Sequence, residues 1–158
     1  MSYFFIQFNI LEDDCELLFE NIYKKYNYID GLINGAGVNS STPFLEIKES
    51  EVNNIFEINF NFVSKCCQIY IQKTLQLQKP GRIINIGSNS PDQTKREPHK
   101  YAIEKFALDK ANDQLFYQGV NTTNVRFGYF DTPRVEHINK PKMSVKYCVE
   151  VIDWILYK

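Results

Sequence analysis

The amino-acid sequence predicts an α/β fold with a parallel sheet of about four strands and flanking helices. Short apolar stretches alternate along the 158 residues with longer segments whose apolar side chains recur at helical spacing. The stretch 83–86 holds three isoleucines, as expected of a central strand in a parallel sheet. Polar residues follow it directly, at the end of the strand where open α/β sheets bind ligands. We therefore expect one domain over residues 1–158, with its functional site at this edge of the sheet.

The first part of the chain is predicted to contain two strands around one helix. Residues 3–8 are aromatic and apolar, which is typical of a short buried strand. Apolar residues then recur at helical spacing, so we expect a helix over residues 11–26, with Asp13 or Asp14 near its positive amino-terminal end. Residues 29–34 form the second expected strand, and the glycines that follow it allow a close approach to the backbone.

The rest of the chain is predicted to hold three helices and two strands. One long helix is expected over residues 49–78, because apolar residues mark one side of it until Pro80. After the apolar strand and a polar loop, residues 99–116 again follow helical spacing. Residues 124–127 form the fourth expected strand, and Ser144 is a typical cap for a last helix.

Ser88, Tyr101 and Lys105 form a candidate catalytic group around the apolar strand. Tyr101 and Lys105 are four residues apart in a predicted helix, so both should face the end of the strand that Ser88 follows. A tyrosine pKa of about 10 is too high for acid-base work at neutral pH, but a nearby ammonium lowers it. Such a trio suits proton transfer at a carbonyl or alcohol carbon. The alternative is coincidence, because the chain has ten tyrosines and many lysines.

Five short motifs stand in a particular order along the chain. They are NGAG at 34–37, the asparagine of EINF at 59, INIGS ending at 88, YAIEK at 101–105 and RFGYFDTP at 126–133. Their order and approximate spacing resemble the short-chain dehydrogenase/reductase family. There they correspond to N-N-A-G, a helix asparagine, a strand ending in the catalytic serine, Y-x-x-x-K and P-G-x-x-x-T. The resemblance covers nearly the whole chain and implies a partial Rossmann-like fold of three layers.

The resemblance implies a catalytic tetrad of Asn59, Ser88, Tyr101 and Lys105. In this reading Tyr101 is the acid-base group, Lys105 lowers its pKa and holds ribose hydroxyls, and Ser88 orients the substrate oxygen. Asn59, through its side chain or a local kink of its helix, would hold a water that links Lys105 to solvent. The alternative for Asn59 is a solvent-facing polar residue in an asparagine-rich chain.

The resemblance also implies NAD or NADP as cofactor and a small carbonyl or alcohol compound as substrate. Three positions depart from the family pattern: Asn9 replaces an acidic residue, Gly87 the first serine of a pair, and Phe127 a proline. The choice between NAD and NADP is not readable, because the strand that selects between them has no counterpart here. The implied cofactor-binding residues are Asn9, Asn34, Ala36, Gly37, Tyr101, Lys105 and Thr132.

The family's T-G-x-x-x-G-x-G turn, which holds the cofactor pyrophosphate, does not occur in the 158 residues. We therefore expect a family member shortened at its amino terminus and also at its carboxyl terminus. The strand at 3–8 should then slide beside the strand at 29–34, leaving one sheet face covered mainly by the last helix. That exposed face would favour a homo-oligomer or a completing partner. Two functions stay open: an oxidoreductase, or an inactive remnant that serves as a binding or assembly subunit or is a fragment with no independent role.

Composition and charge argue against nucleic-acid binding, membrane binding, metal binding and secretion. A net charge of −1 and a pI near 6.1 give no electrostatic case for nucleic acid or for anionic membranes. The four cysteines lack metal-type spacing and His99 and His137 are isolated, so we expect no metal site. The amino-terminal apolar run is too short and too soon acidic for a signal peptide, and no run is long enough to cross a membrane. We expect a cytoplasmic protein.

Overall fold

The computed structural model describes residues 4–40, 42, 43, 45–88, 99–137 and 139–157, without the side chains of residues 99–106 and 134. Its centre is a parallel sheet in the order β1 (Gly31–Asn34), β2 (Arg82–Ser88) and β3 (Thr122–Phe127). Gly31 pairs with Arg82 at one border, and Ser88 pairs with Phe127 at the other. The predicted α/β class and parallel sheet are therefore confirmed.

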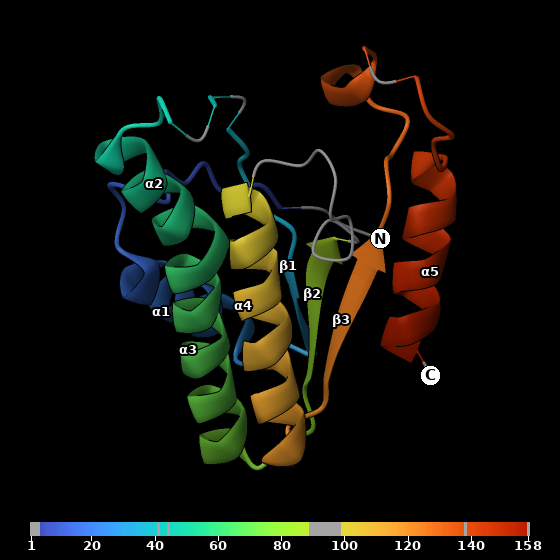
Figure 1. Ribbon diagram of the computed structural model, residues 1–158. Helices are drawn as coiled ribbons and strands as arrows, with labels where there is room; N and C mark the ends of the chain where they lie inside the picture. Colours follow the sequence, from blue (N-terminus) through green and yellow to red (C-terminus); the bar gives the residue numbers. More distant parts are fainter. Residues whose placement is uncertain (1–3, 41, 44, 89–98, 138, 158) are drawn as a thin grey trace.

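Helices cover both faces of this sheet (Figure 1). On one face lie α1 (Cys15–Tyr26), the continuous run from α2 (Glu49–Phe56) to α3 (Phe62–Leu77), and α4 (His99–Tyr117). On the other face lies α5 (Val145–Tyr157), which Ser144 caps as predicted, since its Oγ accepts a hydrogen bond from the Tyr147 N–H at 3.1 Å. None of the described helices is long and apolar enough to cross a membrane.

The fourth strand expected at residues 3–8 is wrong for the part of it that the structure describes, residues 4–8, which pair with no strand. Aromatic contacts with the helices take the place of strand pairing. The Phe4 ring meets Tyr26 edge-on at 6.5 Å between centroids, and the Phe8 ring lies 5.6 Å from Phe62. The run FFIQF also lacks the alternation of apolar and polar residues that would direct one face of a strand toward a core. Its aromatic rings can therefore pack against helices without strand pairing.

The first helix begins later than predicted, at Cys15 instead of residue 11. Asp14 is its N-cap, with a carboxylate oxygen that accepts from the Glu16 N–H at 2.8 Å and the Leu17 N–H at 3.4 Å. Residues 10–12 form a turn before it. The apolar spacing alone could not separate this turn from the helix.

The long helix expected over residues 49–78 has nearly that extent but is not uniform. A π-helical turn, η1 (Glu57–Asn61), lies between α2 and α3. Such turns contain one extra residue and are frequent at functional sites. The helix ends at Gln78, which adopts the left-handed conformation (φ 53°) just before Pro80.

The core lies between the sheet and the three helices α1, α3 and α4. Ile83 and Ile84 of β2 have no exposed surface, as expected of a central strand. Leu115 of α4 is partly buried and packs against this core. The buried core cluster consists of Cys15, Phe19, Val63, Cys66, Cys67, Tyr70, Ile83 and Leu108.

Candidate active site

The carboxyl end of the sheet gathers the elements that carry the predicted site (Figure 1). Asn34 is the last residue of β1 and Ser88 the last of β2, and α4 begins at this same end. Residues 35–37 of the NGAG motif follow β1 as an exposed segment. The fold therefore brings to one edge the NGAG motif at 34–37, Ser88 and the helix that carries the YAIEK motif at 101–105.

Ser88 lies at the point where the chain leaves the sheet. Its residue is only 8% exposed, and it pairs with Phe127 as the last position of the β2–β3 register. Its carbonyl oxygen accepts a hydrogen bond from the Arg126 Nε at 3.2 Å. Ser88 is thus held by backbone pairing and by an arginine, which suits a residue whose position matters.

Tyr101 and Lys105 lie in the first two turns of α4, and their side chains are outside the described part. The helix itself fixes which face carries these positions, because residues seven apart complete about two turns. Leu108 lies seven residues after Tyr101 and belongs to the buried core. Asn112 lies seven residues after Lys105 and is hydrogen-bonded to both neighbouring strands. Positions 101 and 105 therefore belong to the face of α4 that is turned toward the sheet.

Asn59 is fully buried at the centre of η1, which contradicts the alternative of a solvent-facing residue. Its side-chain Oδ1 accepts from the Val38 N–H at 2.8 Å, and its Nδ2 donates to the Val38 carbonyl at 2.9 Å. The amide thus ties the π-helical turn to the loop that follows the NGAG motif. The same turn contacts α4, so η1 links the loop after the NGAG motif to the helix that carries positions 101 and 105.

Asn34 takes part in a buried chain of polar side chains that crosses the whole sheet. Its Nδ2 donates to Asn85 Oδ1 at 2.8 Å and to Cys67 Sγ at 3.4 Å. Asn85 in turn donates to Asn112 Oδ1 at 3.4 Å, and Thr122 Oγ1 donates to the same oxygen at 2.6 Å. This chain joins β1, β2, α4 and β3, and it fixes α4 against the strands. Sequence reasoning missed it.

Of the remaining predicted cofactor residues, Ala36 and Gly37 follow β1, Thr132 follows β3, and Asn9 precedes α1 in the sequence. Asn9 is exposed and precedes α1, where its Oδ1 accepts from the Leu11 N–H at 3.1 Å. Ala36 and Gly37 are exposed. Thr132 is half-buried and caps a short 3₁₀ helix, η3 (Pro133–Val135), with its carbonyl accepting from the Val135 N–H at 3.1 Å.

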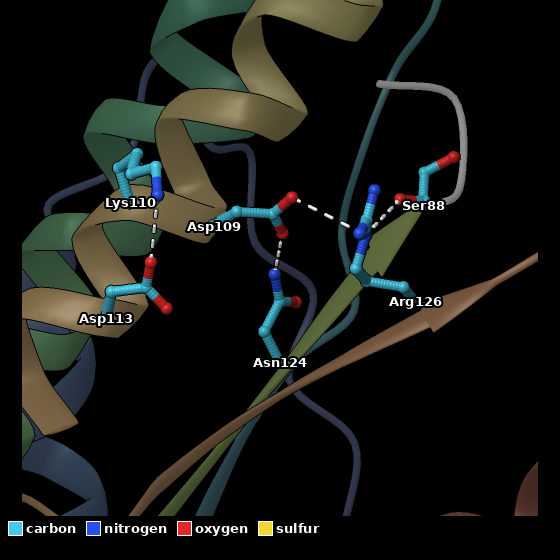
Figure 2. A network of polar contacts seen from close by, with 6 residues as sticks. All are labelled: Ser88, Asp109, Lys110, Asp113, Asn124 and Arg126. Atoms are coloured by element: carbon cyan, nitrogen blue, oxygen red, sulfur yellow. Dashed lines mark hydrogen bonds and ion pairs between the residues drawn. The ribbon is translucent and has the colours of Figure 1, made fainter. Parts of the chain in front are cut away.

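A second polar network, also missed from the sequence, lies beside Ser88 (Figure 2). Arg126 of β3 contacts both the Ser88 carbonyl and the carboxylate of Asp109 on α4. Asn124 donates a hydrogen bond from its Nδ2 to that same carboxylate. The helical position of Asp109, four residues after Lys105, was the available signal.

Burial makes the thiols near this site poor nucleophiles. It raises the pKa of the Cys66 thiol far above the ordinary value and that of the Cys67 thiol to about 11. Cys67 lies directly under the Asn34–Asn85 pair, 3.4 Å from the Asn34 amide nitrogen. The described residues contain no cluster of three or more histidine, cysteine or acidic side chains that could bind a metal ion.

The parallel sheet, the buried strand-end serine and the adjoining helix define an α/β protein of the Rossmann-like type. The family model for short chain dehydrogenases matches residues 1–143, and the chain belongs to this family. Among solved structures of this fold, a 4-hydroxyisoleucine dehydrogenase mutant complexed with NADH and succinate has a TM-score of 0.84 at 19% identity, with 96% of this chain and 70% of that chain covered. ElxO with NADP bound has a TM-score of 0.72 at 20% identity, with coverage of 84% and 55%.

Curated relatives are similar in sequence over most of this chain. A 3-oxoacyl-[acyl-carrier-protein] reductase of Synechocystis is 29% identical over 140 residues, which is 85% of this chain and 56% of that protein. D-erythrulose reductase of Gallus gallus is 32% identical over 119 residues, which is 72% of this chain and 48% of that protein. The chain thus spans about half the length of the curated relatives that it matches.

Proposed function

We propose that this chain carries the catalytic part of a nicotinamide-dependent oxidoreductase that interconverts a small carbonyl compound and its alcohol. The observation that carries the proposal is the orientation of α4. The face that contains positions 101 and 105 also contains Leu108 and Asn112, which are packed and hydrogen-bonded against the sheet. Through Asn112 this face contacts Asn85 of β2, the strand that ends in Ser88.

Each member of the proposed tetrad has a distinct role. Tyr101 donates a proton to the carbonyl oxygen during reduction and removes it during oxidation. Lys105, as a cation one helical turn away, stabilises the phenolate and so lowers the pKa of Tyr101. The Ser88 hydroxyl hydrogen-bonds the substrate oxygen and holds it beside the phenol.

Asn59 would serve the proton supply to Lys105. Two forms of this relay are open, through its side chain or through a kink in its helix. The side-chain amide is engaged with both backbone groups of Val38, and η1 is a local departure from α-helical geometry. These two contacts favour the second form, in which the π-helical turn exposes backbone oxygen to a water near Lys105.

NAD or NADP would supply the hydride when bound, and several residues present fit a nicotinamide nucleotide. The exposed segment 35–37 leaves backbone groups accessible beside β1, and Thr132 stands past the end of β3. Tyr101 and Lys105 would contact the ribose, and Asn9 would lie near the adenine. Asn34 would act through its backbone, since its side chain binds Asn85. The solved structures with NADH and with NADP do not separate the two cofactors for this chain.

A non-catalytic binding or assembly subunit is the second candidate. Within the described residues β1 pairs with β2 alone, and an open groove of about 570 Å³ runs along β1 between α1 and α5. Apolar side chains such as Phe19, Ile22 and Leu156 line it. An unpaired strand edge beside an apolar groove is a place where another polypeptide can add a strand.

A turnover assay separates the two candidates. The chain is incubated with NADH or NADPH and with either acetoacetyl-coenzyme A, a 3-oxoacyl thioester, or D-erythrulose, and the loss of reduced nicotinamide absorbance is followed. The oxidoreductase reading predicts turnover that Tyr101→Phe lowers at least about 100-fold, as expected for loss of the general acid. No turnover with either substrate class by folded protein, or turnover unaffected by Tyr101→Phe, contradicts the proposal.

A further inference from the structure

We infer that Arg126 and Asp109 set the position of Ser88 relative to the face of α4 that carries Tyr101 and Lys105. Arg126 is the first residue of the RFGYFDTP motif, but neither Arg126 nor Asp109 belongs to the proposed catalytic tetrad. Both are proposed here as positioning residues, which act through Ser88 and α4 without contacting the substrate. The inference rests on the proposed function for its catalytic consequence, although the coupling itself is a property of the fold.

Arg126 contacts both the end of β2 and the carboxylate of Asp109 on α4. The Arg126 Nε lies 3.2 Å from the Ser88 carbonyl oxygen and 3.5 Å from Asp109 Oδ2 (Figure 2). One guanidinium therefore contacts both the strand that ends in Ser88 and the helix that carries positions 101 and 105. The side chains are 37% and 18% exposed, so solvent screens this pair less than an ordinary surface pair.

The Asp109 carboxylate is held by two side chains of β3. Asn124 donates to Oδ1 of Asp109, and Arg126 lies beside Oδ2. Asn124 and Arg126 are two residues apart in β3, so their side chains leave the same face of the sheet. Two neighbouring side chains of one strand thus hold both oxygens of a helix carboxylate, which fixes α4 against β3 in rotation and in height.

Gly87, the neighbour of Ser88, lies directly against the side chain of Asn124. An ideal Cβ at position 87 would lie 2.5 Å from Asn124 Oδ1 and 3.1 Å from its Cγ. The Asn124 amide therefore occupies the space that a side chain at position 87 would need. Glycine at this position leaves room for the Asn124 amide, which donates to Asp109.

The same helix offers a matched control. Lys110 and Asp113 form an ion pair of 3.2 Å on α4, one residue beyond Asp109, with side chains that are 64% and 51% exposed (Figure 2). This pair connects two positions of the helix to each other, whereas the Asp109–Arg126 pair connects the helix to the sheet. Loss of the control pair should leave the placement of Ser88 unchanged.

The experiment compares Arg126→Gln, Arg126→Lys, Asp109→Asn and the control Lys110→Gln in two readouts. The first is kcat and KM with the substrate and cofactor used above. We expect Arg126→Gln and Asp109→Asn to lower kcat about 10- to 100-fold with little change in KM, since small misplacement of a catalytic group costs rate more than binding. Arg126→Lys should recover part of the loss, because its ammonium can still reach one of the two partners.

The second readout does not depend on activity. In ¹⁵N–¹H correlation spectra, Arg126→Gln should shift the backbone amides of Gly87 and Ser88 and also those of residues 99–105, which lie about one to three helical turns before Asp109. Lys110→Gln should leave Ser88 unshifted. Shifts confined to the immediate neighbours of residues 109 and 126 would overturn the inference, as would equal kcat losses in Arg126→Gln and Lys110→Gln. If the wild-type chain turns nothing over, the proposed function fails and the spectra alone decide the positioning role.

Discussion

Asn59 binds both backbone groups of Val38 with the two ends of its side-chain amide, at 2.8 and 2.9 Å. A buried residue in a π-helical turn thereby fixes the loop that follows the first strand. The two residues are 21 positions apart, and their contact joins the loop after the NGAG motif to the π-helical turn that contacts α4. The helix asparagine therefore has a structural task in addition to the relay proposed for it.

Asn59→Ala should destabilise the fold by about 2–4 kcal/mol, because it removes two hydrogen bonds of a fully buried side chain and leaves the part-buried N–H and carbonyl of Val38 without these partners. Urea unfolding followed by circular dichroism measures this change. Asn61→Ala is the matched control, since Asn61 is an exposed asparagine of the same turn and bonds Glu57 four residues before it. Similar losses of stability in both variants would contradict the role assigned to Asn59.

Gly87→Ser should destabilise the chain by about 1–3 kcal/mol, because the new side chain overlaps the Asn124 amide. Asn124→Ala should remove the overlap, so the double variant Gly87→Ser/Asn124→Ala should lose less than the sum of the two single variants. A double-mutant cycle of unfolding free energies measures this coupling. Additive losses would mean that the two residues do not compete for space.

The buried thiols should resist alkylation and should make the fold sensitive to alkaline pH. All four cysteines are buried and free, so iodoacetamide at pH 8 should label them slowly in folded protein and rapidly in urea. Burial raises the pKa of Cys67 from 9.0 to about 11. The unfolded state therefore loses this proton first, and the free energy of unfolding should fall as pH rises above about 9.

Cys67→Ala should reduce this alkaline loss, which pH-dependent urea unfolding between pH 7 and about 10 would measure. Tyr23, whose pKa burial raises to about 12, contributes in the same direction only at higher pH. A free energy of unfolding that stays constant or rises above pH 9 would contradict the burial of these thiols.

A homo-oligomer stays a prediction, and α5 is where it can be tested. Trp154 of this helix is 62% exposed, so Trp154→Glu should lower the mass of an oligomer measured by light scattering if α5 forms the interface. Leu75→Glu is the control, because Leu75 is 71% exposed on α3, which covers the opposite face of the sheet. A fall in mass with Leu75→Glu alone would place the interface elsewhere. Other exposed apolar residues of α5 are Val145, Tyr147, Val149 and Tyr157.

Local signals in the sequence were sufficient for most of the fold. The Ser144 cap and the isoleucines of β2 depend on neighbours in the sequence, so their elements were predicted correctly. The strand expected at residues 3–8 failed because a strand requires a partner edge, which local pattern does not supply. Apolar spacing likewise did not reveal the π-helical turn, which depends in part on the distant contact between Asn59 and Val38.

The candidate site likewise contains residues that short motifs predict and contacts that depend on long-range packing. Ser88 and the spacing of Tyr101 and Lys105 follow from short motifs, and the family resemblance places them at one edge of the sheet. The contacts of Asp109 and Arg126 could not be predicted, because they depend on the rotation of α4 against β3 and on the space above Gly87. Long-range packing decides these, and motif spacing carries no information about it.

Binding of a nicotinamide cofactor separates an oxidoreductase from a non-catalytic subunit. The purified chain is titrated with NADH and with NADPH while the fluorescence of the reduced nicotinamide is followed, and Tyr101→Phe serves as a variant that retains most cofactor contacts. An oxidoreductase should show saturable binding of at least one cofactor by both proteins, with turnover lost in Tyr101→Phe alone. The absence of binding at millimolar cofactor by folded protein would contradict it and would favour a non-catalytic subunit.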